Sequence, residues 1–322
     1  MPTVVIAYPG FPDIAVERGI LAQADAEIIH TGELDSPEAQ AAAAGADALM
    51  VTIEKVPAEL IERMTRCKLI CRIGTGLDAI DIPAATRRGM WVTNVPDYAI
   101  DEVSTHAIAL LLNHARRLPT LFALVDDGGW WDGQRVGAVP RLRGQTLGLL
   151  GYGRIGQATG AKARGLGLNV IVYDPYLSED TVAADDVRQV DLQTLLRESD
   201  YVSLHAPLTD TTHEILNAST LALMKPTAYI INTARGGLIN EAALLEAVQS
   251  EKLAGAALDV LQQEPAAPDS PLRREPRILL TPHAAWYSEE ASIDVRVKGT
   301  EDVVRVLNGQ PPRTPVNAVQ SP

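Results

Sequence analysis

Residues 147–156 read Leu-Gly-Leu-Leu-Gly-Tyr-Gly-Arg-Ile-Gly, and this stretch decides the fold of the chain. Its apolar residues are typical of a buried strand, which runs directly into a Gly-x-Gly-x-x-Gly turn. Gly151 permits the tight turn, Gly153 lets a pyrophosphate approach the backbone, and Gly156 lets the following helix pack closely on the strand. The first N–H groups of that helix are free to bind phosphate oxygens. The stretch therefore predicts a dinucleotide-binding unit.

A second apolar run, Asn169–Tyr173, leads to Asp174. In such units an acid about 20 residues beyond the glycines hydrogen bonds the adenosine ribose hydroxyls, and its charge repels a 2′-phosphate. A glycine-rich turn in an unrelated α/β protein would leave Asp174 unexplained. We therefore expect NAD rather than NADP as the cofactor.

The composition is that of a globular protein large enough for two domains, with 322 residues, of which 46% are hydrophobic and 21% charged. A net charge of −13 argues against nucleic acid or an anionic membrane as a partner, because both attract positive charge. The chain shows no signal sequence and no apolar run of membrane-spanning length. Cys67 and Cys71 fit neither a Cys-x-x-Cys motif nor a four-ligand zinc site, so we expect buried, reduced thiols. These features predict a cytoplasmic protein.

The first part of the chain alternates between short apolar runs and helical patterns, which predicts a parallel α/β domain. The expected strands are Thr3–Tyr8, Glu27–Ile29, Ala48–Thr52, Leu69–Ile73 and Trp91–Thr93, and the expected helices include Glu38–Ala44 and Pro57–Met64. An amphipathic helix over Glu289–Leu307 is expected to return to this domain. The first domain therefore comprises residues 1–97 and 288–322.

Residues 98–287 form the second expected domain. A helix is predicted over Asp101–Leu118, followed by a loop, Asp126–Arg143, whose Trp130 and Trp131 are expected to pack locally or at a subunit contact. Further strands are expected at Tyr201–His205, Ala228–Asn232, Gly255–Asp259 and Ile278–Thr281, with helices such as Gln193–Glu198 and Glu241–Glu251 between them. The fold class is thus α/β, with two doubly wound parallel-sheet domains, a Rossmann NAD-binding domain and a discontinuous flavodoxin-like substrate domain.

Polar side chains follow the strands of the second domain, which is where ligands bind in doubly wound folds. Arg235 lies in Asn-Thr-Ala-Arg-Gly-Gly, Glu264 follows the next strand, and His283 follows the last strand in Thr-Pro-His. A guanidinium binds a carboxylate through two hydrogen bonds, and an imidazolium donates a proton to a carbonyl oxygen whose carbon accepts hydride. A glutamate beside the histidine orients the ring. The set predicts hydride transfer to a 2-oxo acid.

Each of these residues also has a structural interpretation. Arg235 alone would be a surface ion-pair residue, Glu264 a solvated loop acid, and His283 a structural histidine. The two glycines after Arg235 indicate a close backbone approach, and the combination of the three groups favours catalysis. Four other histidines are interpreted as non-catalytic, namely His30, His106, His114 and His213.

The motifs around these three residues resemble those of the D-isomer-specific 2-hydroxyacid dehydrogenases, and the likeness extends from Arg72-Ile73-Gly74-Thr75-Gly76-Leu77-Asp78 to the final helix. Within that family, Asp174-Pro175-Tyr176-Leu177-Ser178 and the residues from Thr281 to Ser288 are most similar to the C-terminal-binding-protein branch. The resemblance implies a substrate domain split around a nicotinamide domain, an active site in the cleft, and a homodimer formed through the cofactor domains.

The resemblance also assigns site residues. It implies Arg235, Glu264 and His283 as the catalytic set. Arg72, the backbone N–H groups of Thr75 and Gly76, and the side chain of Trp286 are implied as substrate-binding groups. The residues expected to contact the cofactor are Gly151, Gly153, Arg154, Ile155, Gly156, Asp174, Pro175, His205, Ala206, Pro207, Thr212, Thr233, Ala234 and Asp259, the last near the nicotinamide amide.

We therefore predict an NAD-dependent D-2-hydroxyacid dehydrogenase that reduces a 2-oxo acid to the (R)-2-hydroxy acid, with a small acid as substrate and no metal. Trp286 predicts a substrate side chain that is apolar, flat or thioether-containing. The alternatives are an NAD(H)-sensing dimeric interaction protein of the corepressor type, a hydroxypyruvate or glyoxylate reductase, and a phosphoglycerate dehydrogenase. The intact Arg-Glu-His set favours an enzyme over a sensor, and Trp286 suits a phosphorylated substrate poorly.

Overall fold

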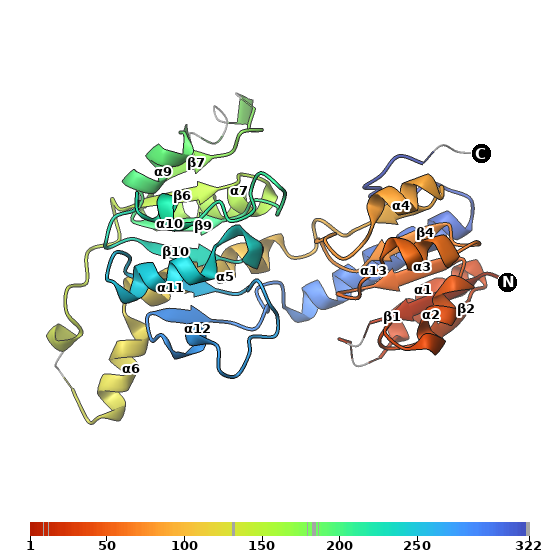
Figure 1. Cartoon of the computed structure of the whole chain (residues 1–322), viewed down its shortest axis with the longest axis horizontal. Helices are drawn as coiled ribbons and strands as arrows, with labels where there is room; N and C mark the ends of the chain where they lie inside the picture. The colour runs from red at the N-terminus through yellow and green to blue at the C-terminus, as the bar shows by residue number, and fades with distance from the viewer. Residues whose placement is uncertain are drawn as a thin grey trace. The chain divides into compact units, whose positions relative to one another are not determined.

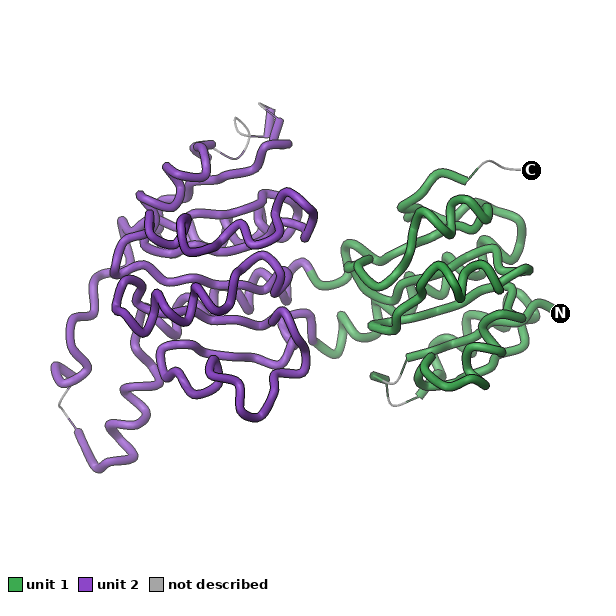
Figure 2. Tube along the Cα trace, viewed as in Figure 1, with its two compact units in different colours: residues 1–99, 288–322 green, residues 100–287 purple. Residues whose placement is uncertain are grey.

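The computed structural model describes residues 1–8, 10–11, 13–130, 133–178, 180–181, 185 and 187–319 (Figure 1). Trp131, expected to pack locally, lies outside the described residues. The chain divides into two compact units (Figure 2). Unit 1 comprises residues 1–99 and 288–322, and unit 2 comprises residues 100–287.

Unit 1 is built on a five-stranded parallel sheet in the order β2-β1-β3-β4-β5. The strands are β1 (Thr3–Ala7), β2 (Glu27–His30), β3 (Ala48–Val51), β4 (Leu69–Arg72) and β5 (Trp91–Thr93). The helices of this unit are α1 (Ala15–Leu21), α2 (Pro37–Ala44), α3 (Ala58–Arg63), α4 (Ile82–Arg87) and α13 (Glu289–Leu307). This strand order is that of flavodoxin-like folds, as predicted.

The inner strands β1, β3 and β4 are almost wholly buried, since helices cover both faces of the sheet. Successive residues alternate: Val5, Leu49 and Ile70 pack with the buried residues of α2, α3 and α4. Their neighbours Val4 and Met50 pack with Leu21 of α1 and with the buried valines of α13. The last helix of the chain therefore completes the core of unit 1.

Helix α13 is joined to unit 1 by two kinds of contact. A Cβ on Gly299 would lie 2.4 Å from the side chain of Ile73, so glycine lets the helix approach β4. The buried Arg296 guanidinium donates two hydrogen bonds of 2.6 Å to Glu17 of α1, which also accepts one from Tyr8. Cys71 of β4 donates to the carbonyl of Gly299.

The two cysteines are free and buried, as predicted for reduced thiols. Burial raises the pKa of both Cys67 and Cys71 to about 12, so neither carries a thiolate at neutral pH.

Unit 2 contains a seven-stranded parallel sheet in the order β12-β11-β10-β9-β6-β7-β8. The strands are β6 (Thr146–Leu150), β7 (Asn169–Tyr173), β8 (Arg188–Gln189), β9 (Tyr201–Leu204), β10 (Tyr229–Asn232), β11 (Gly255–Leu258) and β12 (Ile278–Leu280). The helices are α5 (Ile100–Ala115), α6 (Leu118–Asp126), α7 (Arg154–Gly165), α9 (Leu192–Glu198), α10 (Ala218–Leu221), α11 (Glu241–Gln249) and α12 (Pro271–Arg274). The strand order reverses at β6, as in a Rossmann fold, so the predicted fold class is confirmed.

One predicted helix is shorter than expected. The segment Asp101–Leu118 was expected to be a single helix, but α5 ends at Ala115 and α6 begins at Leu118. Arg117 between them has a left-handed backbone with φ of 50°, and Pro119 lies in the first turn of α6 and has no N–H to continue the earlier helix. Among the described residues no single helix is long and apolar enough to cross a membrane, and only the bent pair of α5 and α6 has that length and composition together.

Candidate active site

The Gly-rich turn between β6 and α7 has the geometry that its sequence predicts. Gly151 has φ of 94°, and a Cβ there would lie 2.6 Å from the backbone nitrogen of Ala206. A Cβ on Gly156 would lie 2.5 Å from the carbonyl oxygen of Gly151. A Cβ on Gly153 would meet nothing among the described residues within 4 Å, so the space above it is open. Gly153 is the N-cap of α7, and no described side chain caps the helix. A pyrophosphate fits this open helix start.

Asp174 lies at the carboxyl end of β7, next to the turn. One of its carboxylate oxygens accepts a hydrogen bond of 2.9 Å from the backbone N–H of Tyr152, and the other accepts one of 2.9 Å from Tyr176. Both contacts hold the carboxylate beside the glycines while each oxygen keeps a free lone pair. Two ribose hydroxyls suit these acceptors.

The loop after β9 lies at the same carboxyl end of the sheet as the Gly-rich turn. His205 contacts Ser203 through Nε2 at 2.9 Å, and burial lowers the pKa of His205 to about 4, so the ring is neutral at neutral pH. Thr212 closes the turn by donating to the carbonyl of Pro207 at 2.7 Å. Beyond β10, the buried hydroxyl of Thr233 has no hydrogen-bond partner among the described residues. An unpartnered buried hydroxyl at this edge fits a site for a polar ligand such as the dinucleotide.

The residues of the predicted catalytic set come from three strand ends of unit 2. His283 follows β12 and its Nδ1 lies 2.7 Å from Oε2 of Glu264. The side chain of His283 is 45% exposed and that of Glu264 is 36% exposed. Partial burial raises the pKa of Glu264, but the hydrogen bond from His283, the N–H of Leu261 and the charges of His283 and Arg235 outweigh it and bring the pKa below its usual value. Glu264 is therefore an ionised partner that holds the imidazole.

A glycine brings the loop of Arg235 against the loop of Glu264. A Cβ on Gly236 would lie 1.9 Å from the carbonyl carbon of Leu261, so only glycine fits. The N–H of Leu261 in turn donates to Oε1 of Glu264 at 2.9 Å. The close backbone approach expected from the glycines after Arg235 is therefore present.

The carboxylate of Asp259 is buried, and it accepts hydrogen bonds from the loop that follows β12. Oδ1 accepts from the N–H of Ala284 at 3.0 Å, and Oδ2 accepts from the N–H of Ala285 at 2.9 Å. The hydroxyl of Thr281 also donates to Oδ1, and Nε2 of His106 lies 3.2 Å from that hydroxyl. Sequence reasoning set His106 aside, because a helical histidine 175 residues from Thr281 gives no local signal of this contact.

Arg72 is the last residue of β4 in unit 1, and Thr75 and Gly76 lie in the loop that follows this strand. The guanidinium of Arg72 donates to the carbonyl of Ile73 at 2.7 Å. A Cβ on Gly74, which has φ of 142°, would lie 1.2 Å from that guanidinium nitrogen. Thr75 is held by its hydroxyl, which donates to Val95, and by Asn94, which donates to its carbonyl. Gly74 thus makes room for the guanidinium, a role that sequence reasoning missed.

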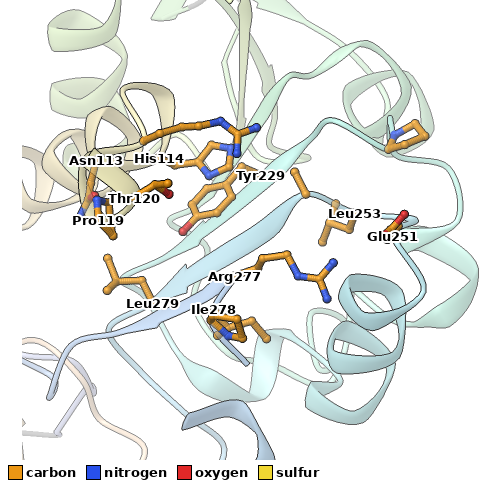
Figure 3. Close-up of a pocket in the computed structure, with 14 residues that line it drawn as sticks. Asn113, His114, Pro119, Thr120, Tyr229, Glu251, Leu253, Arg277, Ile278 and Leu279 are labelled. Carbon is orange, nitrogen blue, oxygen red and sulfur yellow. The ribbon is translucent and has the colours of Figure 1, made fainter. Parts of the chain in front are cut away.

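Trp286 lies in unit 2, three residues beyond His283, and packs edge-to-face on Tyr287 with ring centroids 5.6 Å apart. A cavity of about 380 Å³ lies at the opposite edge of the same sheet, at the amino ends of β10, β11 and β12 (Figure 3). Its wall includes His114, stacked on Tyr229 with ring centroids 3.7 Å apart. None of the predicted site residues lines this cavity.

The family of the chain follows from its match to a family model. Residues 108–285 match the NAD binding domain of the D-isomer specific 2-hydroxyacid dehydrogenases. The chain belongs to this family. The family match to its NAD binding domain identifies NAD as the cofactor, in agreement with Asp174. When bound, NAD(H) supplies the hydride that the family's reaction transfers.

Other comparisons agree with the family. D-3-phosphoglycerate dehydrogenase from Archaeoglobus fulgidus is 40% identical over 263 residues, which are 82% of this chain and 50% of that protein. The chain spans about half the length of the curated relatives it matches. A protein of known structure from Thermus thermophilus has a TM-score of 0.87 and 34% identity, covering 98% of this chain and all of that one. D-lactate dehydrogenase from Aquifex aeolicus, in complex with NAD and lactic acid, has a TM-score of 0.86 and 28% identity, covering 95% and 96% of the two chains.

Proposed function

We propose that this chain is an NAD-dependent D-2-hydroxyacid dehydrogenase that reduces a 2-oxo acid to the (R)-2-hydroxy acid. The contact of 2.7 Å between Nδ1 of His283 and Glu264 carries the proposal. With Glu264 ionised, Nδ1 keeps its proton, and the opposite ring nitrogen, Nε2, is the one that exchanges a proton with substrate. A structural histidine would not need an ionised, partly exposed carboxylate as its partner.

The proposed roles follow from this geometry. Arg235 binds the substrate carboxylate through its two parallel N–H groups and thereby fixes the neighbouring carbonyl. As hydride reaches the carbonyl carbon, the carbonyl oxygen takes up the electron pair, and Nε2 of His283 transfers its proton to that oxygen. His283 ends neutral, with Nδ1–H still held by Glu264. In the reverse direction the same nitrogen removes the hydroxyl proton.

Arg72 and the backbone N–H groups of Thr75 and Gly76 are proposed as further carboxylate ligands. Trp286 is proposed to contact the substrate side chain and to favour apolar, flat or thioether-containing groups. The identity to phosphoglycerate dehydrogenases supports a second candidate substrate, 3-phosphohydroxypyruvate. The C-terminal-binding-protein branch, suggested by sequence, stays a prediction.

The function is tested by NADH oxidation rates with a panel of 2-oxo acids. We expect turnover of an acid with an apolar, aromatic or thioether side chain, such as phenylpyruvate or 4-methylthio-2-oxobutyrate, above that of glyoxylate or hydroxypyruvate. A preference for 3-phosphohydroxypyruvate would favour the second candidate. Absence of NADH oxidation with every acid, in protein that binds NADH, would contradict the proposed activity and favour an NAD(H)-sensing interaction protein.

We also propose that the partner is a second copy of this chain and that the protein works in the cytoplasm. Helix α6 projects from the body of unit 2 (Figure 1) and buries none of its residues. Phe122, Val125 and the nearby Trp130 are 63%, 51% and 68% exposed. A helix of nine residues with no buried face is marginal in water, and a second copy that covers these apolar side chains would stabilise it.

Light scattering during size-exclusion chromatography tests the homodimer. We expect twice the chain mass of 34.5 kDa for the parent and the monomer mass for a Phe122→Asp, Val125→Asp variant, because two buried carboxylates at the interface are costly. The exposed Ile293 of α13, replaced by aspartate, serves as the control and should leave the mass unchanged. A monomeric parent would refute the proposed partner.

A further inference from the structure

The loop that carries His283 has an unfavourable backbone at that residue. His283 has φ of 53°, a left-handed backbone conformation that residues other than glycine rarely adopt. Asp259 holds this loop through both its backbone carbonyl and its side-chain carboxylate. Its carbonyl oxygen accepts from the N–H of His283 at 2.9 Å, and its carboxylate accepts from the N–H groups of Ala284 and Ala285. The position of the imidazole therefore depends on the position of the Asp259 carboxylate.

Two further side chains fix that carboxylate. A carboxylate only accepts hydrogen bonds, so the hydroxyl of Thr281 donates its proton to Asp259. The oxygen of the Thr281 hydroxyl can then only accept a hydrogen bond. Nε2 of His106, 3.2 Å away on helix α5, must therefore carry a proton and donate to Thr281. The hydrogen bonds run in one direction, from His106 to Thr281 to Asp259.

These hydrogen-bond donors are important because the Asp259 carboxylate is buried. The side chain of Asp259 is 1% exposed, whereas that of His106 is 27% exposed. A carboxylate so deeply buried is stable only when its lone pairs are occupied by donors. Nε2 of His106 also lies 3.7 Å from Oδ1 of Asp259. Loss of His106 would leave the Thr281 hydroxyl free to rotate and the carboxylate less well held.

We infer that His106 is a positioning residue for the catalytic histidine, acting through Thr281 and Asp259. The inference rests on the proposed function only in that His283 is the proton donor; the hydrogen-bond chain itself does not depend on turnover. The side chain of His106 contacts Thr281, and its role is to keep the loop over residues 281–285 in the conformation that aims the imidazole.

The kinetic test compares His106→Ala with His106→Gln, since glutamine keeps an N–H donor at the end of its side chain. We expect His106→Ala to lower kcat about 10-fold to 100-fold, because misplacement of a catalytic group by about 1 Å has an effect of this size. The KM for the oxo acid should change less than about threefold, because Arg235 is untouched. His106→Gln should recover most of the lost kcat. His114→Gln is the matched control: it removes another partly buried histidine of α5 that lines the cavity at the opposite sheet edge, and it should keep kcat.

A double-mutant cycle separates positioning from a general loss of stability. Thr281→Val removes the bridging hydroxyl while keeping the shape, and the His106→Ala, Thr281→Val pair should lose no more kcat than either single variant. Circular dichroism and NADH binding establish that each variant is folded. Additive losses, or a His106→Ala variant with kcat within about twofold of the parent, would overturn the inference.

A second measurement does not require activity. In protein labelled with ¹⁵N-histidine, NMR should show a proton on Nε2 of His106, and this signal should shift in the Thr281→Val variant. An unprotonated Nε2 would overturn the hydrogen-bond direction even in an active enzyme. If the parent reduces no 2-oxo acid but the Nε2 proton is present, the proposed function fails while the link from His106 to Asp259 stands.

Discussion

Replacement of His283 by alanine or asparagine is expected to lower kcat for 2-oxo acid reduction by about 10²-fold to 10⁴-fold, the usual contribution of a general acid. Neither residue can donate the proton that Nε2 supplies. Asparagine is the better test of chemistry, because it tolerates the left-handed backbone that His283 adopts, with φ of 53°. The NADH dissociation constant should stay close to that of the parent, and steady-state kinetics with fluorescence titration measure both.

The control is His30→Ala, which removes an exposed imidazole at the end of β2. It should leave kcat unchanged. Turnover of His283→Asn within about threefold of the parent would refute the role of His283 as the proton donor.

The His283–Glu264 pair also predicts how the activity falls at low pH. The pKa of Glu264 lies below its usual value, so the carboxylate stays charged as the pH falls through the range near 4.3 where an ordinary glutamate takes up a proton. The His283–Glu264 contact is lost only below that range. Reductase activity should therefore persist down to pH values below about 4.3 and then fall, provided that the protein remains folded. An acid limb above this value in folded protein would contradict the ionised pair.

Replacement of Arg235 by glutamine should raise the KM for the 2-oxo acid about 100-fold. Hydrogen bonds to charged groups contribute roughly 1.5–3 kcal/mol each, and two of them are proposed between the guanidinium and the substrate carboxylate; glutamine keeps one neutral donor group, which recovers part of the loss. Arg235→Lys should fall between the parent and glutamine, because an ammonium keeps the charge but lacks the planar pair of donors.

A carbonyl substrate without a carboxylate provides the control for Arg235. The parent should reduce it poorly, and Arg235→Gln should reduce it as poorly as the parent does, because the lost contact was to the carboxylate. An equal loss on both substrates would indicate that Arg235 supports the fold of the Glu264 loop, which Gly236 brings against it, and not the substrate.

The cofactor half of the site was predictable from one continuous segment. Gly151 needs a positive φ, Gly156 needs a close backbone approach, and Asp174 ends the next strand, so each requirement is written in the local sequence. The fold class followed for the same reason, since alternating strands and helices are local patterns. The other predicted element ends lay within two residues of the observed ones. The predicted single helix over Asp101–Leu118 was wrong because its last turn is interrupted at Arg117, whose left-handed backbone has no signal of its own in the sequence.

The sequence alone thus determined the dinucleotide turn, the preference for NAD, the two doubly wound sheets and the identity of the catalytic candidates. Only the tertiary structure decided which of these groups touch: His283 and Glu264 are 19 residues apart, and His106 and Thr281 are 175 apart. The physical reason is that turns and strands form from interactions between near neighbours, whereas a hydrogen bond between distant residues exists only once the sheet has brought its strand ends to one edge. For the same reason the structural need for Gly74 beside Arg72, and the identity of Leu261 as the backbone that Gly236 approaches, become visible only in three dimensions.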